Sequence, residues 1–436
     1  MGIFRHKLAL LNIVVVLATR HQVRSFSCKT NLIASSTSLK AMSNFVVLDE
    51  NFAIDGSPES LDGLASKYKS VLYLCPDCDG DSAGGGFSAV TSAWSPTTAK
   101  HVSIVASDPC FQANCAETGL GLHGVIAKYS EVERALDSLP RPTLIMCKSN
   151  RRAGMVWAAY TGVKSGMSAD DVMALAAAKG LTFTGSAGFV AWCTAVVTTL
   201  HKKSKPIVFR QMAEAESNTY TYLLADPDTK DCILIDPVLE TVDRDLSIVK
   251  GLGLTLKYVL NTHVHADHIT GSGKIKTILA SEGQKCESVI SSVDAMADIH
   301  IKDGDRITFG GRSVIGYNTP GHTSGCYTFV LDDFSMVFTG DALLIRGCGR
   351  TDFQGGSSET LYHSVHSRIL NLRDEAILYP GHDYKGLMSA SVYEERTSNP
   401  RLTKPLAEFI ELMANLQLPY PKKIVESVPA NLKCGL

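Results

Sequence analysis

The segment from His263 to His268 (His-Val-His-Ala-Asp-His) places four metal-binding side chains within six residues. It follows the apolar, β-prone run 256–260, which predicts a buried strand. The four side chains therefore belong to the loop that leaves the carboxyl end of this strand. A bound metal ion also needs ligands from other loops, so further strands must end at the same place.

Three later segments repeat this arrangement of a β-prone run followed by a residue of metal-ligand type. The runs 312–317, 335–339 and 376–379 lead to His322, Asp341 and His382, respectively. A lone histidine is usually a surface residue or a hydrogen-bonded core residue. Four such loops in order are hard to produce by packing alone, and the sequence therefore predicts a metal site on one edge of a sheet structure.

The first 48 residues stand apart, because they carry six Lys or Arg residues and no acidic residue. We expect residues 1–44 to be a targeting segment. The apolar run 8–18 resembles a signal-peptide core, while the basic, Ser-rich continuation favours mitochondrial import, with plastid and secretory routes as alternatives. A run of about eleven residues is short for a membrane span, so no stable membrane insertion is expected.

The remaining chain is ordinary globular material with an acidic balance. Without the six basic residues, 36 Lys and Arg face 44 Asp and Glu, a net charge of −8, which argues against a nucleic-acid partner. The twelve cysteines are scattered along a long chain and do not indicate a disulfide scaffold.

The length of 436 residues suits two domains. The basic, polar segment 201–206 is the expected boundary, which gives domains at 45–200 and 206–436. In the second domain, strands at 207–210, 219–225 and 232–236 are followed by alternating strands and helices, so it is an α/β domain.

The metal motifs resemble those of the metallo-β-lactamase superfamily, whose fold is an αββα sandwich. The segments 347–354, 360–366, 382–384, 395–402 and 428–435 resemble the persulfide dioxygenases of that superfamily, over essentially all of residues 206–436. The alternative is a zinc-dependent thioester hydrolase of the glyoxalase II kind, which usually carries a helical C-terminal extension. Here we expect one helix, over 405–416.

The resemblance implies one Fe(II) per chain, held by His263, His322 and Asp341. Two imidazoles and one carboxylate leave coordination positions open, as non-haem iron oxygenases require. Spacing alone does not distinguish iron from zinc. Four further residues would orient ligands and water or form a second metal site: His265, Asp267, His268 and His382.

The implied reaction oxidises glutathione persulfide with O₂ and water to sulfite and glutathione. The resemblance assigns glutathione binding to Arg350, Tyr384 and Arg401, and arginine side chains suit the carboxylates of glutathione. Loop arginines also commonly form surface ion pairs. The same resemblance allows a homodimer.

In the first domain, a strand at 143–146 leads through the loop 147–152 to a helix at 153–163, which places Cys147 at a helix N-terminus. The Cys-x4-Arg loop resembles rhodaneses and the smaller α/β phosphatase-like domain of β-lactamase-hydrolase-like fusions. Asn150 replaces the usual glycine, and Met146 replaces the histidine of tyrosine phosphatases. Three roles stay open for this domain: a catalytic persulfide relay through Cys147, a phosphatase activity, or a structural or regulatory role. A relay predicts that the pKa of the Cys147 thiol is lowered. A rival class for the whole protein is a sulfur carrier without turnover.

Overall fold

The computed structural model describes residues 45–56, 61, 63–76, 86–200 and 206–436. The expected targeting segment and residues 201–205 of the expected boundary lie outside the described residues. From Asn44 to Leu436 the chain forms one compact unit, so the division at 201–206 stays a prediction. Among the described helices, none is long and apolar enough to cross a membrane.

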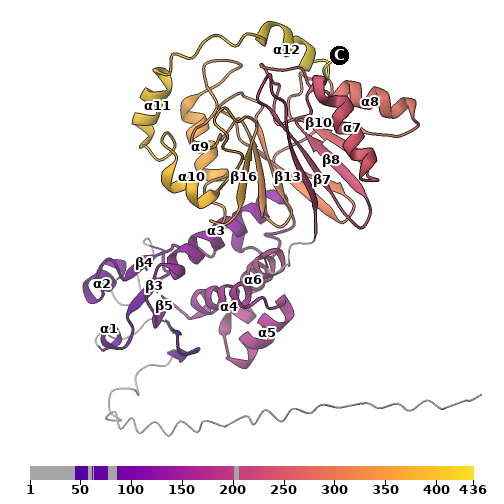
Figure 1. Ribbon diagram of the computed structural model, residues 1–436. Coiled ribbons are helices and arrows are strands. Elements are labelled where there is room, and N and C mark those ends of the chain that lie inside the picture. Colours follow the sequence, from indigo (N-terminus) through magenta and orange to yellow (C-terminus); the bar gives the residue numbers. More distant parts are fainter. Residues whose placement is uncertain (1–44, 57–60, 62, 77–85, 201–205) are drawn as a thin grey trace, which may run out of the picture. The chain divides into compact units, whose positions relative to one another are not determined.

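The N-terminal part is built on a five-stranded sheet with the order β1-β2-β5-β3-β4 (Figure 1). Strand β1 pairs antiparallel with β2, and the other neighbours are parallel. Its strands are β1 (Val46–Val47), β2 (Phe52–Gly56), β3 (Ser70–Tyr73), β4 (Ala99–His101) and β5 (Thr143–Cys147). Its helices are α1 (Leu64–Lys67), α2 (Gly86–Ala93), α3 (Gly119–Asp137), α4 (Arg151–Ser165), α5 (Ala169–Ala178) and α6 (Ala187–Leu200), with 3₁₀ turns at Pro109–Phe111 and Thr182–Gly185.

The predicted strand, loop and helix around Cys147 are confirmed as β5 and α4. The loop ends at Asn150, which has φ 59° and directly precedes α4. Asparagine tolerates this left-handed conformation better than most residues, which is why it can stand in the place of glycine.

The C-terminal part contains two six-stranded sheets, with the orders β11-β10-β9-β8-β7-β6 and β12-β13-β14-β15-β16-β17. The first sheet comprises β6 (Val208–Ala213), β7 (Tyr220–Ala225), β8 (Asp231–Ile235), β9 (Thr255–Leu260), β10 (Glu287–Ile290) and β11 (Ile299–His300). The second comprises β12 (Arg306–Phe309), β13 (Arg312–Asn318), β14 (Tyr327–Leu331), β15 (Met336–Gly340), β16 (Ile377–Pro380) and β17 (Ala390–Ser391). The helices are α7 (Val242–Gly251), α8 (Ser272–Ser281), α9 (Ser358–Arg368), α10 (Val392–Ser398), α11 (Leu406–Ala414) and α12 (Ile424–Asn431), and a 3₁₀ turn spans Leu239–Thr241.

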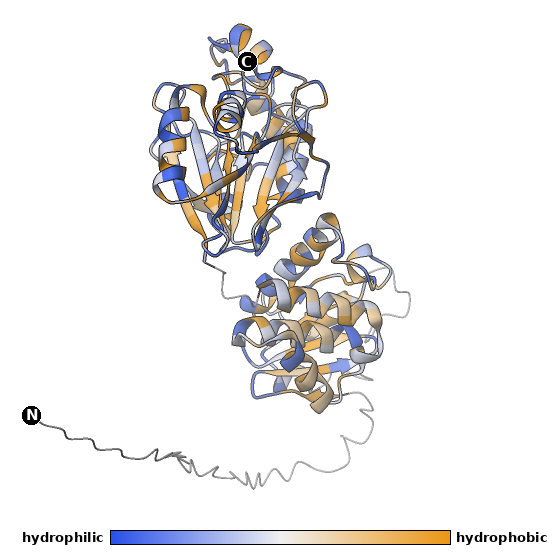
Figure 2. Cartoon of the chain, turned by 90° about the vertical axis from the view of Figure 1, so that its right-hand side faces the viewer, coloured by the Kyte–Doolittle hydropathy of each residue, from blue (hydrophilic) through white to orange (hydrophobic). Residues whose placement is uncertain are grey.

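The two sheets face each other across a single apolar core. Tyr222 and Ile233 of the first sheet pack with Phe329 and Phe338 of the second, and all four are buried. Figure 2 shows apolar residues concentrated on these strands. Helices α7 and α8 lie outside the first sheet, and α9 and α10 lie beside the second (Figure 1). Because many of these strands are buried on both faces, their sequences are nearly continuous apolar runs. The two sheets and the helices outside them form four layers, which is the predicted αββα sandwich.

The tail after α10 differs from the prediction. The expected single helix over 405–416 is α11, but a second helix, α12, follows it and contains Pro429. Proline inside a helix removes a backbone hydrogen bond, so the sequence pattern gave no sign of a helix there.

Candidate metal centre

Four strand ends bring the predicted ligand residues to one edge of the sandwich. His263 follows β9 of the first sheet, whereas Asp341 and His382 follow β15 and β16 of the second. His322 lies in the loop between β13 and β14. Strands β15 and β16 pair in parallel, with Gly340 opposite Pro380, so their carboxyl ends, and the residues that follow them, lie side by side.

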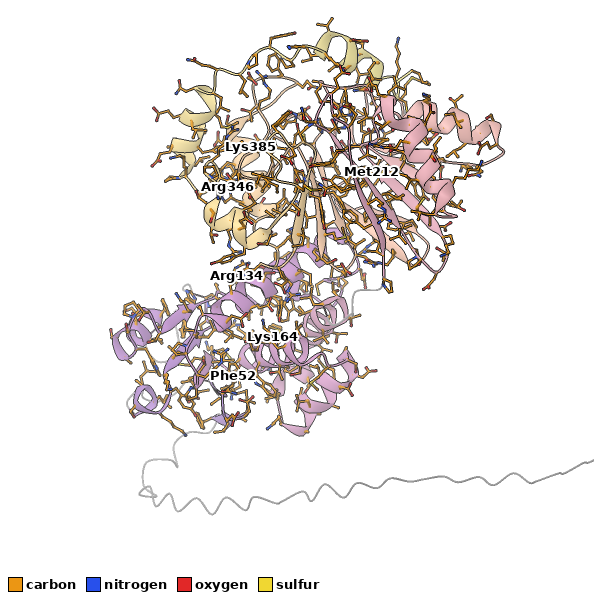
Figure 3. The ribbon with its side chains drawn as sticks, viewed as in Figure 1. Phe52, Arg134, Lys164, Met212, Arg346 and Lys385 are labelled. Atoms are coloured by element: carbon orange, nitrogen blue, oxygen red, sulfur yellow. The ribbon has the colours of Figure 1, made fainter. Side chains whose placement is uncertain are left out.

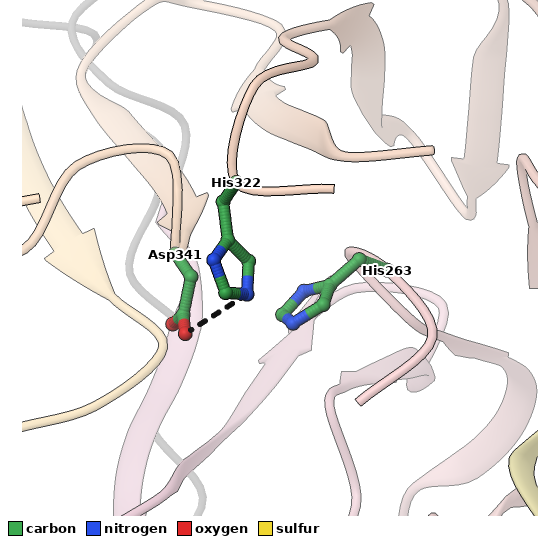
Figure 4. Close-up of side chains that lie close together, drawn as sticks. All are labelled: His263, His322 and Asp341. Atoms are coloured by element: carbon green, nitrogen blue, oxygen red, sulfur yellow. Dashed lines mark ion pairs between the residues drawn. The ribbon is translucent and has the colours of Figure 1, made fainter. Parts of the chain in front are cut away.

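The structure brings His263, His322 and Asp341 into one group (Figure 4). One ligand atom from each lies within 4.8 Å of the others, and His322 Nε2 is 3.6 Å from Asp341 Oδ2. A second group consists of His265, Asp267 and His268. His382 Nε2 lies 3.5 Å from Asp341 Oδ1 and 3.5 Å from Asp267 Oδ2, between the two groups.

Several polar atoms of these groups are buried and lack a hydrogen bond among the described residues. They are Asp341 Oδ1, His265 Nδ1 and His268 Nε2. Buried polar atoms are nearly always paired, so unpaired imidazole nitrogens and a carboxylate oxygen at one place fit a bound cation. Burial and the neighbouring His265 and His322 hold the pKa of His263 well below its usual value. His263 is therefore neutral, as a metal ligand must be.

Asp236, at the end of β8, anchors the motif loop. Its Oδ1 accepts hydrogen bonds from the backbone N–H of Thr262 (2.7 Å) and from His265 Nε2 (3.0 Å), and its Oδ2 accepts one from Thr262 Oγ1 (2.8 Å). Burial disfavours its charged form, but the charge of His265 and these hydrogen bonds outweigh burial and lower the pKa of Asp236. Asp236 was not among the residues predicted from the sequence, although it too follows an apolar strand.

The other imidazoles are oriented by partners that the sequence analysis also missed. Thr262 Oγ1 lies 3.0 Å from His263 Nδ1, and His322 Nδ1 donates to the backbone oxygen of Arg350 at 2.7 Å. Thr219 Oγ1 lies within 3.3 Å of the Nδ1 atoms of both His268 and His382. Such contacts fix which nitrogen of each ring faces the centre.

Two glycines allow the ligand loops to approach each other. A Cβ atom on Gly349 would lie 2.4 Å from the backbone oxygen of Asp341 and 2.9 Å from the ring of His322. A Cβ atom on Gly381 would lie 2.6 Å from Asp341 Oδ1. Any larger residue at either position would displace Asp341 or His322.

A cavity of about 90 Å³ beside the centre, hereafter the charged cavity, is lined by two of the three residues that were predicted to bind glutathione. Tyr384 and Arg401 line it together with His382, Arg346 and Lys385. Figure 3 labels Arg346 and Lys385, which add two cations that the sequence analysis did not single out. The ring of Tyr384 stacks on that of His382, with 5.8 Å between centroids.

Arg350, the third predicted residue, does not line this cavity. Its guanidinium makes two 2.7 Å hydrogen bonds to Asp352 and one to the backbone oxygen of Pro419. It also lies 4.6 Å from the ring centroid of Phe353. This is the loop ion pair that arginines commonly form, and it leaves the Arg350 backbone oxygen as the contact with His322.

Cys147 is the last residue of β5, at the start of the loop that leads to the N-terminal end of α4, and it is fully buried. Its sulfur accepts a hydrogen bond from the backbone N–H of Ala153 at 3.4 Å. Burial raises the pKa of the Cys147 thiol, although backbone hydrogen bonds and Arg152 oppose the shift. The pKa of this buried thiol is therefore shifted in the opposite direction to the one expected for a relay.

Comparisons with known proteins agree with this geometry. Residues 215–280 and 297–382 match the family model of the Metallo-beta-lactamase superfamily. The protein named Persulfide dioxygenase ETHE1, mitochondrial, from Homo sapiens is 56% identical over 232 residues, covering 53% of this chain and 90% of that protein. The crystal structure of ETHE1 from Myxococcus xanthus is 48% identical, with a TM-score of 0.50, and covers 52% of this chain and 100% of its own.

A third relative covers both halves of the chain. The Beta-lactamase hydrolase-like protein of Xylella fastidiosa (strain 9a5c) is 26% identical over 427 residues, covering 89% of this chain and 94% of that protein. A Hydroxyacylglutathione hydrolase of Brucella canis is 29% identical over 238 residues, covering 53% of this chain and 86% of that protein. The hydrolases of the glyoxalase II kind are therefore more distant relatives of the C-terminal half than the persulfide dioxygenases.

Proposed function

This chain belongs to the metallo-β-lactamase superfamily, and its C-terminal half to the persulfide dioxygenases; on that basis we propose that it is an Fe(II)-dependent dioxygenase that oxidises glutathione persulfide. The 56% identity to a protein of that name, over the half that carries His263, His322 and Asp341, is the observation that supports this most. The lower identity to a hydroxyacylglutathione hydrolase makes the zinc hydrolase the weaker candidate.

The proposed reaction converts glutathione persulfide, O₂ and water to glutathione and sulfite. The terminal sulfur loses four electrons, which reduce both atoms of O₂, and water supplies the third oxygen of sulfite. The S–S bond breaks, and glutathione leaves as the thiol. The thiolate-like terminal sulfur of a persulfide is a soft donor that suits a ferrous site with open positions.

In this proposal His263, His322 and Asp341 hold the ion. A bound ferrous ion would supply the electron transfer that joins O₂ to sulfur. Thr262 and the backbone oxygen of Arg350 keep the two imidazoles in orientation through their Nδ1 atoms. Holding the reacting groups in a fixed geometry removes much of the entropic barrier to their reaction.

The charged cavity would receive the glutathionyl part of the substrate. Arg401 and Tyr384 are the residues that the family resemblance assigns, and Arg346 and Lys385 line the same cavity. Glutathione carries two carboxylates, which arginine and lysine side chains would bind.

The second group, His265, Asp267 and His268, would position water and the ligand loop. His265 is already committed to Asp236 through Nε2, and His268 to Asp267 through Nδ1. The alternative use as a second metal site predicts two ions per chain, so metal stoichiometry separates the two.

The test of this proposal is metal analysis combined with O₂ uptake. Protein purified without oxygen should contain about one iron per chain and should consume O₂ with glutathione persulfide. Asp341→Ala should lose iron and activity together, because two protein ligands hold a labile ferrous ion poorly. Glu408→Ala, a surface change on α11, is the matched control. Full activity with zinc and none with iron would contradict the proposal.

For the N-terminal domain, 45–200, we propose a persulfide relay through Cys147; because this thiol is buried and burial raises its pKa, the relay would require Cys147 to become accessible to the sulfur donor. Cys147→Ser should then abolish sulfite formation from a sulfane donor such as thiosulfate, while oxidation of pre-formed glutathione persulfide continues. Absence of a persulfide on Cys147 in mass spectra after exposure to several donors would leave the domain structural or regulatory.

Location and assembly are also proposals. The name of the human relative supports mitochondrial import. A fluorescent fusion of the full chain would test import, and a homodimer would appear in sedimentation of the purified protein.

A further inference from the structure

A second cavity borders the loop that carries His263 and His265, and its lining residues differ from those of the charged cavity. It measures about 10 Å³, and both His263 and His265 line it. Tyr384 and Arg401, which line the charged cavity, are not among its lining residues. A cavity of this size holds about one water-sized molecule.

Most of the polar side chains around this small cavity already have hydrogen-bond partners. Asn261 is hydrogen-bonded to Ser272 and Thr270, and the Asn431 amide donates to the backbone oxygens of His265 and His268. Much of the remaining lining is apolar and includes Val289, Ile290 and Ala295. Among the buried side-chain nitrogen and oxygen atoms of the described lining, His265 Nδ1 is the one that lacks a hydrogen bond, so the side chains offer one open partner to a water molecule, which needs two to four. With one open side-chain partner and a wall that is apolar over Val289, Ile290 and residues 295–297, the cavity suits a small apolar molecule.

A surface hollow of about 700 Å³ lies directly outside the small cavity. Ala295, Met296, Ala297 and Cys434 line both, so one layer of residues separates them. The Met296 side chain is 66% exposed, whereas Ala295 is 3% exposed. Methionine side chains are flexible, so residues 295–297 are the part of this shared wall that a diatomic molecule would cross.

We propose that the small cavity behind His263 is a binding site for dioxygen, which enters from the hollow across residues 295–297. This rests on the proposed dioxygenase function. Glutathione persulfide is charged and suits the cavity of Arg346, Lys385 and Arg401, where it would cover the front of the centre. Dioxygen is apolar and needs no hydrogen bond, so a separate apolar route lets it arrive when the persulfide substrate is in place.

The kinetic test narrows the small cavity by Ala295→Leu. We expect the KM for O₂ to rise at least threefold, while kcat at saturating O₂ and the KM for glutathione persulfide stay unchanged. Val293→Leu is the matched control, because Val293 is 80% exposed and lines only the hollow. If Ala295→Leu does not fold, Ala297→Val makes a smaller change in the same wall. An unchanged KM for O₂ in a folded variant would overturn the proposal.

A second measurement does not depend on turnover. Crystals of the metal-loaded protein held under xenon should bind xenon in the small cavity, and the Ala295→Leu protein should not. An ordered water on His265 Nδ1 with no xenon would overturn the proposal. If the wild-type protein consumed no O₂, the proposed function would fail, whereas the xenon result would still decide whether this is a site for an apolar gas.

Discussion

At the scale of single residues, the candidate metal centre depends on side chains that are not themselves ligand candidates. Asp236 holds His265 directly and reaches His263 through Thr262. It is 1% exposed and has φ 52°, a left-handed backbone conformation that is uncommon for residues other than glycine. A buried, charged residue in such a conformation is costly unless its contacts fix it, so its role is to hold the loop in one geometry.

Asp236→Asn should therefore weaken metal binding without removing a ligand. Outer partners of metal ligands typically contribute about 10- to 100-fold in affinity. We expect a loss of iron affinity in that range, measured by competition with a chelator. Asp228→Asn, on the turn between β7 and β8, should bind iron as the wild type does. Equal affinities for Asp236→Asn and wild type would show that the loop holds its geometry without Asp236.

Arg401 and Arg350 give a second prediction at this scale. Arg401→Gln should raise the KM for glutathione persulfide about 10- to 100-fold, because it removes a charge-assisted contact worth about 1.5–3 kcal/mol. Arg350→Gln should raise it less, since Asp352 and Pro419 already occupy its guanidinium. Steady-state kinetics with iron content measured in parallel tests both. A larger effect at Arg350 would mean that its ion pair with Asp352 opens on substrate binding.

At the scale of elements, helix α12 secures the metal loop from the far end of the chain. Asn431, its last residue, donates to the backbone oxygens of His265 and His268 at 2.8 Å and accepts from the Thr270 N–H. These bonds give a buried loop the partners that its backbone groups need.

Asn431→Ala should destabilise the protein by about 2–4 kcal/mol, because it leaves several buried backbone groups unpaired. Denaturant unfolding of the iron-loaded protein would measure this, and Asn415→Ala, an exposed residue after α11, is the matched control. Destabilisation no greater than that of the control would mean that water replaces the Asn431 amide.

The sequence could predict the strand ends that carry the ligands, because buried strands and metal-binding side chains leave local patterns. The αββα layers and the positions of His263, His322 and Asp341 followed from those patterns and the family resemblance. Asn431 and Thr219 act on the loop across long stretches of chain, and no local pattern marks such contacts. The ion pair of Arg350 with Asp352 could not be predicted either, because the sequence around an arginine does not show whether its side chain binds a substrate or a neighbouring carboxylate.

At the scale of the whole molecule, helix α3 connects the N-terminal sheet region to the sandwich. Arg373 pairs with Glu133 at 3.0 Å, and the Tyr317 hydroxyl donates to the backbone oxygen of Gly119 at 3.0 Å. His123 is 4% exposed, and its Nε2 lies 3.0 Å from the backbone oxygen of Arg368.

His123 should make stability depend on pH. Burial lowers the pKa of His123 to about 4, from 6.5 for an exposed histidine. Between these values the unfolded chain binds a proton that the folded protein does not, so the contribution is complete above pH 6.5 and is lost as pH falls towards 4. The full loss is about 3 kcal/mol.

The measurement is the free energy of unfolding of wild type and His123→Phe between pH 7.5 and 4.5. The variant should lose less stability over this range, while His363→Asn, an exposed histidine of α9, should follow the wild type. Parallel curves for His123→Phe and wild type would mean that His123 is protonated in the folded protein. Effects of acid on the metal site are common to all three proteins and cancel.

The ligand set also joins the two halves of the sandwich. His263 follows a strand of the first sheet, whereas His322 and Asp341 follow strands of the second. A bound ion would therefore cross-link the two sheets. An ion that binds only the folded chain raises the free energy of unfolding in proportion to the logarithm of its concentration. If the ion is the iron proposed above, the supply of iron would set the stability of the folded protein as well as its activity.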